Sequence, residues 1–248
     1  MSFRTTLTSA LTGAVIAVAS VYVLSAAGLL PTPNTTTTVR TYLLAHPEIL
    51  VAMSNRLQEQ QQVADDAARQ TAVDKLGLRP FFNPRLAFIT GPANAKTTFV
   101  EFFDYNCPFC RASNPAVEAF YNVHKKAARF AFIEFPIKGS ASVAAARLAI
   151  AARAQPDKYL AYHFAMMRQH GVVDRKIALA IAQKVGLNVK KLRQDARSTS
   201  ITEAIDSANA LAMAADIDGT PAFIVDGRMR EGAVNARQLA QLLRPRSS

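Results

Sequence analysis

The sequence predicts an α/β domain with an inserted block of helices, preceded by an N-terminal helical stalk. Two runs rich in β-branched and aromatic residues, 97–104 and 129–136, have the composition of buried strands. Between them, residues 111–126 carry apolar side chains at helical spacing, which predicts a β-α-β unit with parallel strands. Half of the 248 residues are apolar, which is ample for one globular core.

The first 31 residues are predicted to be a targeting segment and not part of the fold. Arg4 is followed by an uncharged, largely apolar stretch over residues 7–30. As a helix this stretch would span about 36 Å, enough to cross a bilayer core of about 30 Å. Residues 25–27 supply the small side chains of a signal peptidase site. A cleaved signal peptide and an uncleaved membrane anchor both stay open, and both place the rest of the chain in the periplasm, because Arg4 should remain inside.

Residues 32–38 are predicted to be a polar linker, and residues 39–78 a helical stalk in which Pro47 is the first residue of a helix. Alternating steps of three and four then define a heptad seam, formed by Leu50, Met53, Leu57, Gln60, Ala64, Ala67 and Thr71. Large apolar residues are scarce after Leu57, so the seam is weak. One interpretation is an oligomerisation module that forms a homotrimer. The other is an amphipathic helix that packs on the domain or separates it from the membrane.

The main domain is expected over residues 83–248, with a helical insertion at about 142–215. Residues 86–90 are predicted to be an edge strand. The predicted insertion contains five helices separated by proline and glycine, at residues 142–154, 157–169, 175–185, 189–197 and 201–215. An Asp226-Gly227 turn then predicts a hairpin, and a closing helix is predicted over residues 235–243.

The most informative feature is the pair Cys107 and Cys110, the only cysteines in the chain, which flank Pro108 and Phe109 where the strand turns into a helix. On the first turn of a helix both sulfurs face one side, and the helix dipole favours the thiolate of the first cysteine. A thiolate attacks disulfides, and a second cysteine can resolve the mixed disulfide that forms. A structural disulfide closing so short a loop would restrain the unfolded chain little, and a zinc site would need two more ligands. The sequence therefore predicts a redox pair with no metal and no cofactor.

Glu101 lies in the middle of the apolar strand, six residues before Cys107. If this carboxyl is buried, its pKa should rise, which would let it carry a proton for Cys110. The alternative is that strand alternation points Glu101 toward solvent.

The formal charge of +11 is concentrated between Lys138 and Arg197, where twelve Lys and Arg residues face three Asp residues. These charges lie on helical segments without interleaved aromatic residues, which argues against nucleic-acid binding and favours a solvated helix face. Contact with anionic lipid or acidic clients is the next interpretation.

The segment 99–110 (Phe-Val-Glu-Phe-Phe-Asp-Tyr-Asn-Cys-Pro-Phe-Cys) resembles the DsbA family of thioredoxin-fold oxidoreductases. The segments 134–137 and 219–223 match later landmarks of that family, so the resemblance covers about residues 83–243. Residues 42–50 are similar to the N-terminal region of its ScsC (suppressor of copper sensitivity) branch.

The resemblance implies a thioredoxin-like fold, with Cys107 as the exposed nucleophile, Cys110 as the resolving thiol and Glu101 as its proton carrier. Pro108 and Phe109 occupy the dipeptide that tunes the redox potential. Since Phe109 is apolar where some relatives carry His, a milder oxidant is expected. Thr220-Pro221 resembles the cis-proline loop that lies against the active disulfide and pairs with the client backbone.

The favoured function is that of an exported protein thiol-disulfide oxidoreductase acting as a disulfide isomerase. Its expected partners are client proteins with disulfides or thiols and a membrane redox partner. A monomeric DsbA-like dithiol oxidase is the alternative within the same class. A copper(I)-binding protein that uses the same soft thiolates is the alternative of another class.

Overall fold

The computed structural model describes residues 18–24, 26–27 and 35–243. It divides into two compact units, Met1–Gln61 and Gln62–Ser248. The predicted targeting segment, residues 1–31, falls largely outside the described residues. Among the residues that are described, no helix has both the length and the apolar character needed to cross a membrane.

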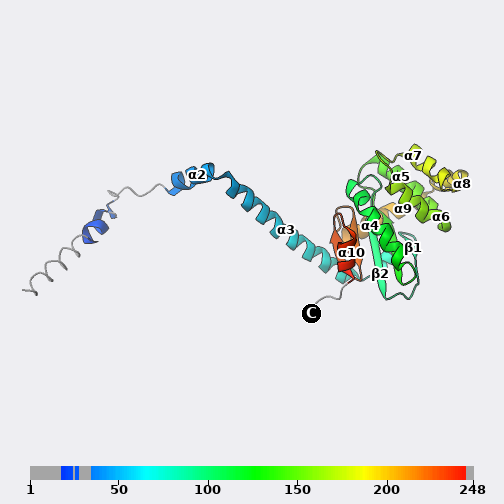
Figure 1. Ribbon diagram of the computed structural model, residues 1–248, viewed down its shortest axis with the longest axis horizontal. Coiled ribbons are helices and arrows are strands. Elements are labelled where there is room, and N and C mark those ends of the chain that lie inside the picture. Colours follow the sequence, from blue (N-terminus) through cyan, green and yellow to red (C-terminus); the bar gives the residue numbers. More distant parts are fainter. Residues whose placement is uncertain (1–17, 25, 28–34, 244–248) are drawn as a thin grey trace, which may run out of the picture. The chain divides into compact units, whose positions relative to one another are not determined.

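Helix α2 spans Thr35–Ala45 and helix α3 spans Pro47–Leu76 (Figure 1). Pro47 is the first residue of α3, as predicted. The expected linker is wrong at its end, because α2 already begins at Thr35. Thr35 and the threonines that follow it form the first turn of α2, where the backbone amides have no intrahelical partner.

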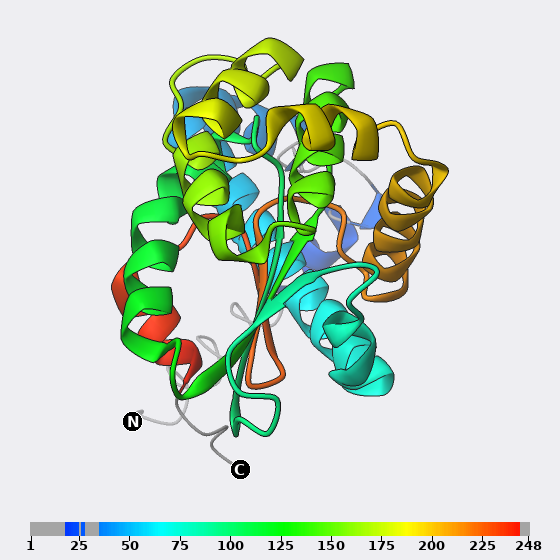
Figure 2. The same cartoon turned by 90° about the vertical axis from the view of Figure 1, so that its right-hand side faces the viewer.

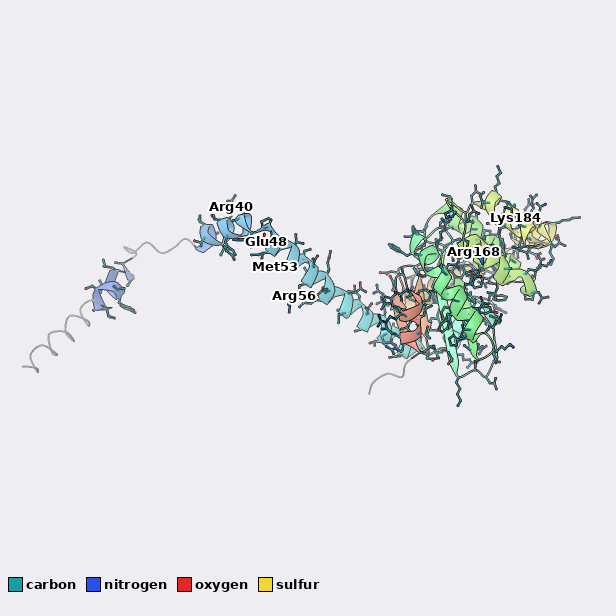
Figure 3. The ribbon with its side chains drawn as sticks, in the orientation of Figure 1. Arg40, Glu48, Met53, Arg56, Arg168 and Lys184 are labelled. Atoms are coloured by element: carbon teal, nitrogen blue, oxygen red, sulfur yellow. The ribbon has the colours of Figure 1, made fainter. Side chains whose placement is uncertain are left out.

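The apolar residues at the start of the predicted seam are exposed in this single chain. The exposed fractions are 53% for Leu50, 61% for Met53 and 56% for Leu57. Met53 and Arg56 both project from α3 in Figure 3. In the first unit, α3 therefore presents an apolar stripe that its own unit does not bury.

The second unit is built on a five-stranded sheet of order β1-β3-β2-β4-β5. Its strands are β1 (Phe88–Thr90), β2 (Thr97–Phe103), β3 (Ala128–Glu134), β4 (Ala222–Val225) and β5 (Arg228–Glu231). The central strands β2 and β3 are parallel and joined by α4 (Pro108–His124), whereas β1 and β4 pair antiparallel with them. The predicted β-α-β unit, edge strand and hairpin are confirmed.

Strand alternation sorts the core onto the two faces of the sheet. On one face Phe99, Phe130 and Phe223 belong to a cluster that continues into α4 and the inserted helices. On the other face Val100, Ile133 and Ile224 pack with Ala208 and Leu211 of α9, together with Val73 of α3. Figure 2 shows α4 and α10 (Ala236–Leu242) on one side of the sheet and α9 on the other.

Five helices form the insertion, as predicted: α5 (Ser140–Ala152), α6 (Pro156–Met167), α7 (Arg175–Lys184), α8 (Val189–Asp195) and α9 (Thr199–Ala214). Helices α7, α8 and α9 begin after side chains that accept a hydrogen bond from a first-turn amide, namely Asp174, Asn188 and Ser198. Such caps satisfy amides that the helix leaves unpaired and so set where each helix starts.

The last turns of α3 belong to the second unit. Val73 is 1% exposed and packs with Phe81, which follows α3 in the short 3-10 helix η1 (Arg79–Phe82). The side chain of Gln70 donates to the main-chain oxygen of Gly227 at 2.7 Å and accepts from the amide of Met229 at 2.9 Å. The end of α3 is thereby fastened to the β4-β5 hairpin.

Candidate active site

Cys107 is the residue that precedes α4, and Pro108 is the first residue of the helix. Proline suits this position because its missing N–H has no intrahelical partner to lose. Both cysteines are free thiols. The pKa of Cys107 is lowered to about 5. The main cause is a hydrogen bond from Cys110, opposed by burial and helped by the amides of Cys110 and Phe109.

Cys110 behaves in the opposite way. Burial is the first cause that raises the pKa of its thiol far above the usual range, and the hydrogen bond to Cys107 raises it further. The amide of Asp104 lies 3.5 Å from the Cys110 sulfur. The pKa values of two cysteines three residues apart are thus shifted in opposite directions. Near neutral pH, Cys107 is a thiolate and Cys110 is a thiol.

The loop before β4 lies against the first cysteine. The Cys107 sulfur is 3.1 Å from the main-chain oxygen of Thr220, and the Thr220–Pro221 peptide bond is cis, as the resemblance implied. The Thr220 hydroxyl is buried and has no hydrogen-bond partner among the described residues. The expected exposure of Cys107 is wrong for this conformation, because the Thr220 loop covers its sulfur. The neighbouring side chain of Phe109 is 62% exposed.

Glu101 lies in the centre of β2 and is 2% exposed, so the alternative of a solvent-facing carboxyl is wrong. Burial raises its pKa from 4.5 to about 8. Its Oε2 has no hydrogen-bond partner in the described part of the chain. The Glu101 charge also raises the pKa of Cys110. The pKa of this carboxyl lies close to neutral pH, its Oε2 has no hydrogen-bond partner among the described residues, and its charge is felt by Cys110. Such a group can take up or release a proton.

This geometry coincides with a family match. Residues 98–244 match the sequence model of the DSBA-like thioredoxin domain, which covers more than half of the chain. The chain belongs to the DsbA-like thioredoxin family. Residues 37–64 match a second model, the copper resistance protein ScsC N-terminal domain. The resemblance to the ScsC branch is therefore confirmed as well.

Two solved structures show the same relationship. A thioredoxin-like oxidoreductase from Silicibacter pomeroyi is 37% identical, covers 66% of this chain and 92% of its own, and superposes with a TM-score of 0.61. BcfH from Salmonella enterica Typhimurium is 29% identical and covers 91% of this chain and 98% of its own, with a TM-score of 0.66. The domain is thus of the thiol-disulfide oxidoreductase type.

Among curated proteins, the chain is similar to the Na(+)/H(+) antiporter NhaA of Herminiimonas arsenicoxydans, with 28% identity over 174 residues. That match covers 70% of this chain and 28% of the antiporter. The chain therefore spans little more than a quarter of the length of that relative.

In this DsbA-like protein a network of hydrogen bonds around Asp104 holds the turn before Cys107. The buried carboxylate of Asp104 accepts hydrogen bonds from the amide of Asn106 and the hydroxyl of Ser142, both at 2.7 Å, and from the amide of Lys138 at 2.9 Å. Asn106 in turn pairs through its side chain with both main-chain groups of Val173. The turn is thereby tied to two segments of the helical insertion.

The sequence analysis did not predict this hydrogen-bond network. The signal was an Asp at the end of a strand, two residues before an Asn, which is the spacing of a side chain that caps its own turn. The partners Ser142 and Val173 could not be found in this way, because they are brought to the turn by tertiary contacts alone.

A second buried network was also missed. Glu134, read from the sequence only as a family landmark, is 1% exposed, forms an ion pair with Arg153 and accepts from the hydroxyl of Tyr159 at 2.8 Å. His163 lies 3.1 Å from the Tyr105 hydroxyl, and burial lowers its pKa to about 3, so its ring is neutral. These groups join the Cys107 turn to α5 and α6.

Proposed function

We propose that this protein exchanges disulfides with exported client proteins through Cys107 and Cys110. The observation that carries the proposal is the opposite pKa shift of the two thiols. The Cys107 thiolate attacks one sulfur of a client disulfide, a mixed disulfide forms, and the other client sulfur leaves as a thiolate. Cys110 then loses its proton and attacks the Cys107 sulfur. This releases the second client thiol and leaves the Cys107–Cys110 disulfide.

Glu101 is the proposed proton carrier of the second step. Cys110 cannot attack as a thiol, and burial opposes its ionisation. A neighbouring carboxylate can take the proton, and a carboxyl with a pKa of about 8 is a good match to a reaction near neutral pH. In the oxidising direction the same carboxyl returns the proton to Cys110 when it leaves the disulfide.

Thr220 and Pro221 form the proposed client-binding loop, since their main chain lies beside the reacting sulfur. Exposed apolar side chains accompany it. Phe109 is 62% exposed, and Val172, next to the segment that pairs with Asn106, is 64% exposed. Exposed apolar groups near a reactive thiol suit unfolded clients, whose own apolar residues are accessible.

Pro108 and Phe109 are the proposed tuning residues of the redox couple. Neither side chain offers a hydrogen-bond donor to the Cys107 thiolate. We therefore expect a milder oxidant than relatives that carry His in this dipeptide. The reduction potential of the Cys107–Cys110 couple measures this directly, and it also indicates the direction of electron flow.

Isomerisation is the proposed main activity, with the stalk as its structural basis. An isomerase must attack incorrect disulfides repeatedly and benefits from several active sites on one assembly. The stripe of Leu50, Met53 and Leu57 is exposed in the single chain, which is the condition expected of an assembly surface. We propose a homotrimer formed through residues 39–78, although the compact unit that carries the active site already begins at Gln62.

A periplasmic location and a membrane redox partner complete the proposal. An isomerase works only in the reduced state, and each resolution by Cys110 leaves the pair oxidised. Electrons must then come from a donor, which in the periplasm has to be supplied across the membrane.

The decisive experiment follows the recovery of active ribonuclease from scrambled ribonuclease by the reduced protein, beside the oxidation of reduced ribonuclease by the oxidised protein. An isomerase rescues the scrambled substrate at a rate well above that of glutathione alone. Activity in the second assay alone would support the monomeric dithiol oxidase.

Copper(I) binding is a second candidate, favoured by the description of the family model that matches residues 37–64. The two thiolates are soft ligands suited to this ion. Titration of the reduced protein with copper(I), beside the Cys107→Ser variant, tests it. Binding that survives the loss of Cys107 would place the metal elsewhere in the chain.

A further inference from the structure

Arg69, near the end of α3, makes a cluster of polar contacts with the loop of residues 216–221. Its side chain is 11% exposed. The Nε atom donates to the main-chain oxygen of Asp216 at 3.1 Å, and Nη2 donates to the carboxylate of Asp218 at 3.3 Å. Nε also lies 3.2 Å from Oε2 of Glu231 on β5. One guanidinium thus contacts both the start of the loop and the strand that pairs with its end.

Glu231 in turn packs directly on the loop. A Cβ atom added to Gly219 would lie 2.3 Å from Oε1 of Glu231, so the carboxylate occupies the space that only a glycine leaves free. The amide of Gly232 donates to the main-chain oxygen of Pro221 at 2.8 Å. Arg69 therefore holds the loop both through its own contacts and through Glu231.

The far end of the loop reaches the reacting sulfur, because the main-chain oxygen of Thr220 lies 3.1 Å from Sγ of Cys107. Asp65, Asp66, Asp218 and Glu231 are the acidic groups around Arg69. Without the guanidinium these carboxylates would repel one another across the base of the loop. Arg69 thus offsets a charge cluster that would otherwise push the loop away from β5.

We infer that Arg69 is a positioning residue that fixes loop 216–221 in the geometry in which it binds clients beside Cys107. Arg69 touches neither cysteine, and it lies outside both matched segments, 37–64 and 98–244. The inference rests on the proposed function, since it assigns to the loop the binding of the client main chain. It also means that removing residues 1–78 would remove a support of the active site together with the stalk.

The test compares Arg69→Ala and Arg69→Lys with Lys75→Ala, which removes an exposed cation from the same helix. Three quantities are measured on the full chain. The first is KM and kcat for a peptide with one disulfide, and the second is the rate of Cys107 alkylation by iodoacetamide. The third is amide hydrogen exchange over residues 217–223.

For Arg69→Ala we expect KM for the peptide to rise about fivefold or more, the change expected when charge-assisted hydrogen bonds that order a loop are lost. We expect kcat to stay within about twofold and alkylation to be no slower, because the thiolate itself is untouched. Exchange over residues 217–223 should accelerate, Arg69→Lys should recover part of the loss, and Lys75→Ala should match the wild type.

Unchanged hydrogen exchange over residues 217–223 in Arg69→Ala would overturn the inference. So would a rise in KM accompanied by equally large falls in kcat and in the rate of Cys107 alkylation. The latter pattern indicates general destabilisation. If the wild-type protein fails to turn over the peptide, the proposed function fails, while hydrogen exchange still decides whether Arg69 holds the loop.

Discussion

The turn that carries Cys107 and the part of α3 before Gln62 differ in where their side chains find partners. At the turn, Asp104 is 2% exposed and accepts three hydrogen bonds from its own domain. Along α3, Leu50 and Met53 are more than half exposed. The turn finds its hydrogen-bond partners within one chain, whereas the stripe on α3 leaves apolar surface that a second copy could bury. The comparison separates the chemistry that we assign to one domain from the assembly that we propose for the stalk.

The largest effect is expected from the two cysteines. Cys107→Ser should abolish disulfide exchange, because the nucleophile is needed to start the reaction. Cys110→Ala should instead accumulate clients as mixed disulfides, because the nucleophile still attacks but nothing resolves the product. Non-reducing gels of each variant with a scrambled client check both. Rapid alkylation of Cys110 in the wild type at neutral pH, with Cys107 unmodified, would invert the two roles.

Much of this turn could be predicted from the sequence, because its signals are local. The strand, the helix that begins at Pro108 and the redox pair are encoded within residues 97–126. For Glu101 the sequence left a buried and a solvent-facing carboxyl as alternatives, and the structure decides for the buried one. The resemblance implied that Thr220 lies against the cysteine pair, whereas the support of loop 216–221 by Arg69 could not be predicted. That support depends on residues more than a hundred positions apart that only the folded sheet brings together.

The next effect in size concerns Glu101. Glu101→Gln keeps the shape of the side chain but cannot accept a proton, so resolution by Cys110 should slow on the order of tenfold to a hundredfold. Attack by Cys107 should be nearly unchanged. Stopped-flow measurement of mixed-disulfide decay separates the two steps. An equal slowing of both steps in Glu101→Gln would indicate a change in the packing of β2 and remove the proton-transfer role.

Removal of residues 1–61 tests the other side of the comparison. We expect a monomer that oxidises dithiols at the rate of the full chain, because Arg69, Gln70 and Val73 stay in place. It should lose most of its isomerase activity, because the proposed assembly surface is gone. Light scattering and the scrambled ribonuclease assay measure the two properties. A longer deletion, of residues 1–78, should also impair client binding. If the chain from residue 39 onward is a monomer at tens of micromolar, the stalk is a spacer and the monomeric dithiol oxidase is the better description.

The smallest effect is the pH dependence of stability, which distinguishes Cys107 at the turn from Glu101 in β2. Cys107 has a lowered pKa of about 5, so in the reduced protein its contribution is complete above the ordinary thiol pKa and is lost as the pH falls through 5. Glu101 has a raised pKa of about 8, so its contribution has the opposite sign and is lost as the pH rises from 4.5 through 8.

The two contributions oppose each other in the reduced protein, and disulfide formation removes that of Cys107. Above pH 6.5 the buried, neutral His163 no longer contributes a change of the opposite sign, so between pH 6.5 and 8 the oxidised protein should lose stability with rising pH, while the reduced protein changes less. Urea denaturation of both redox states across this range measures the difference. Glu101→Gln is the control, because it should flatten the curve of the oxidised protein. A parallel pH dependence in both redox states would mean that Cys107 is not a stabilised thiolate, and the chemical half of the comparison would lose its basis.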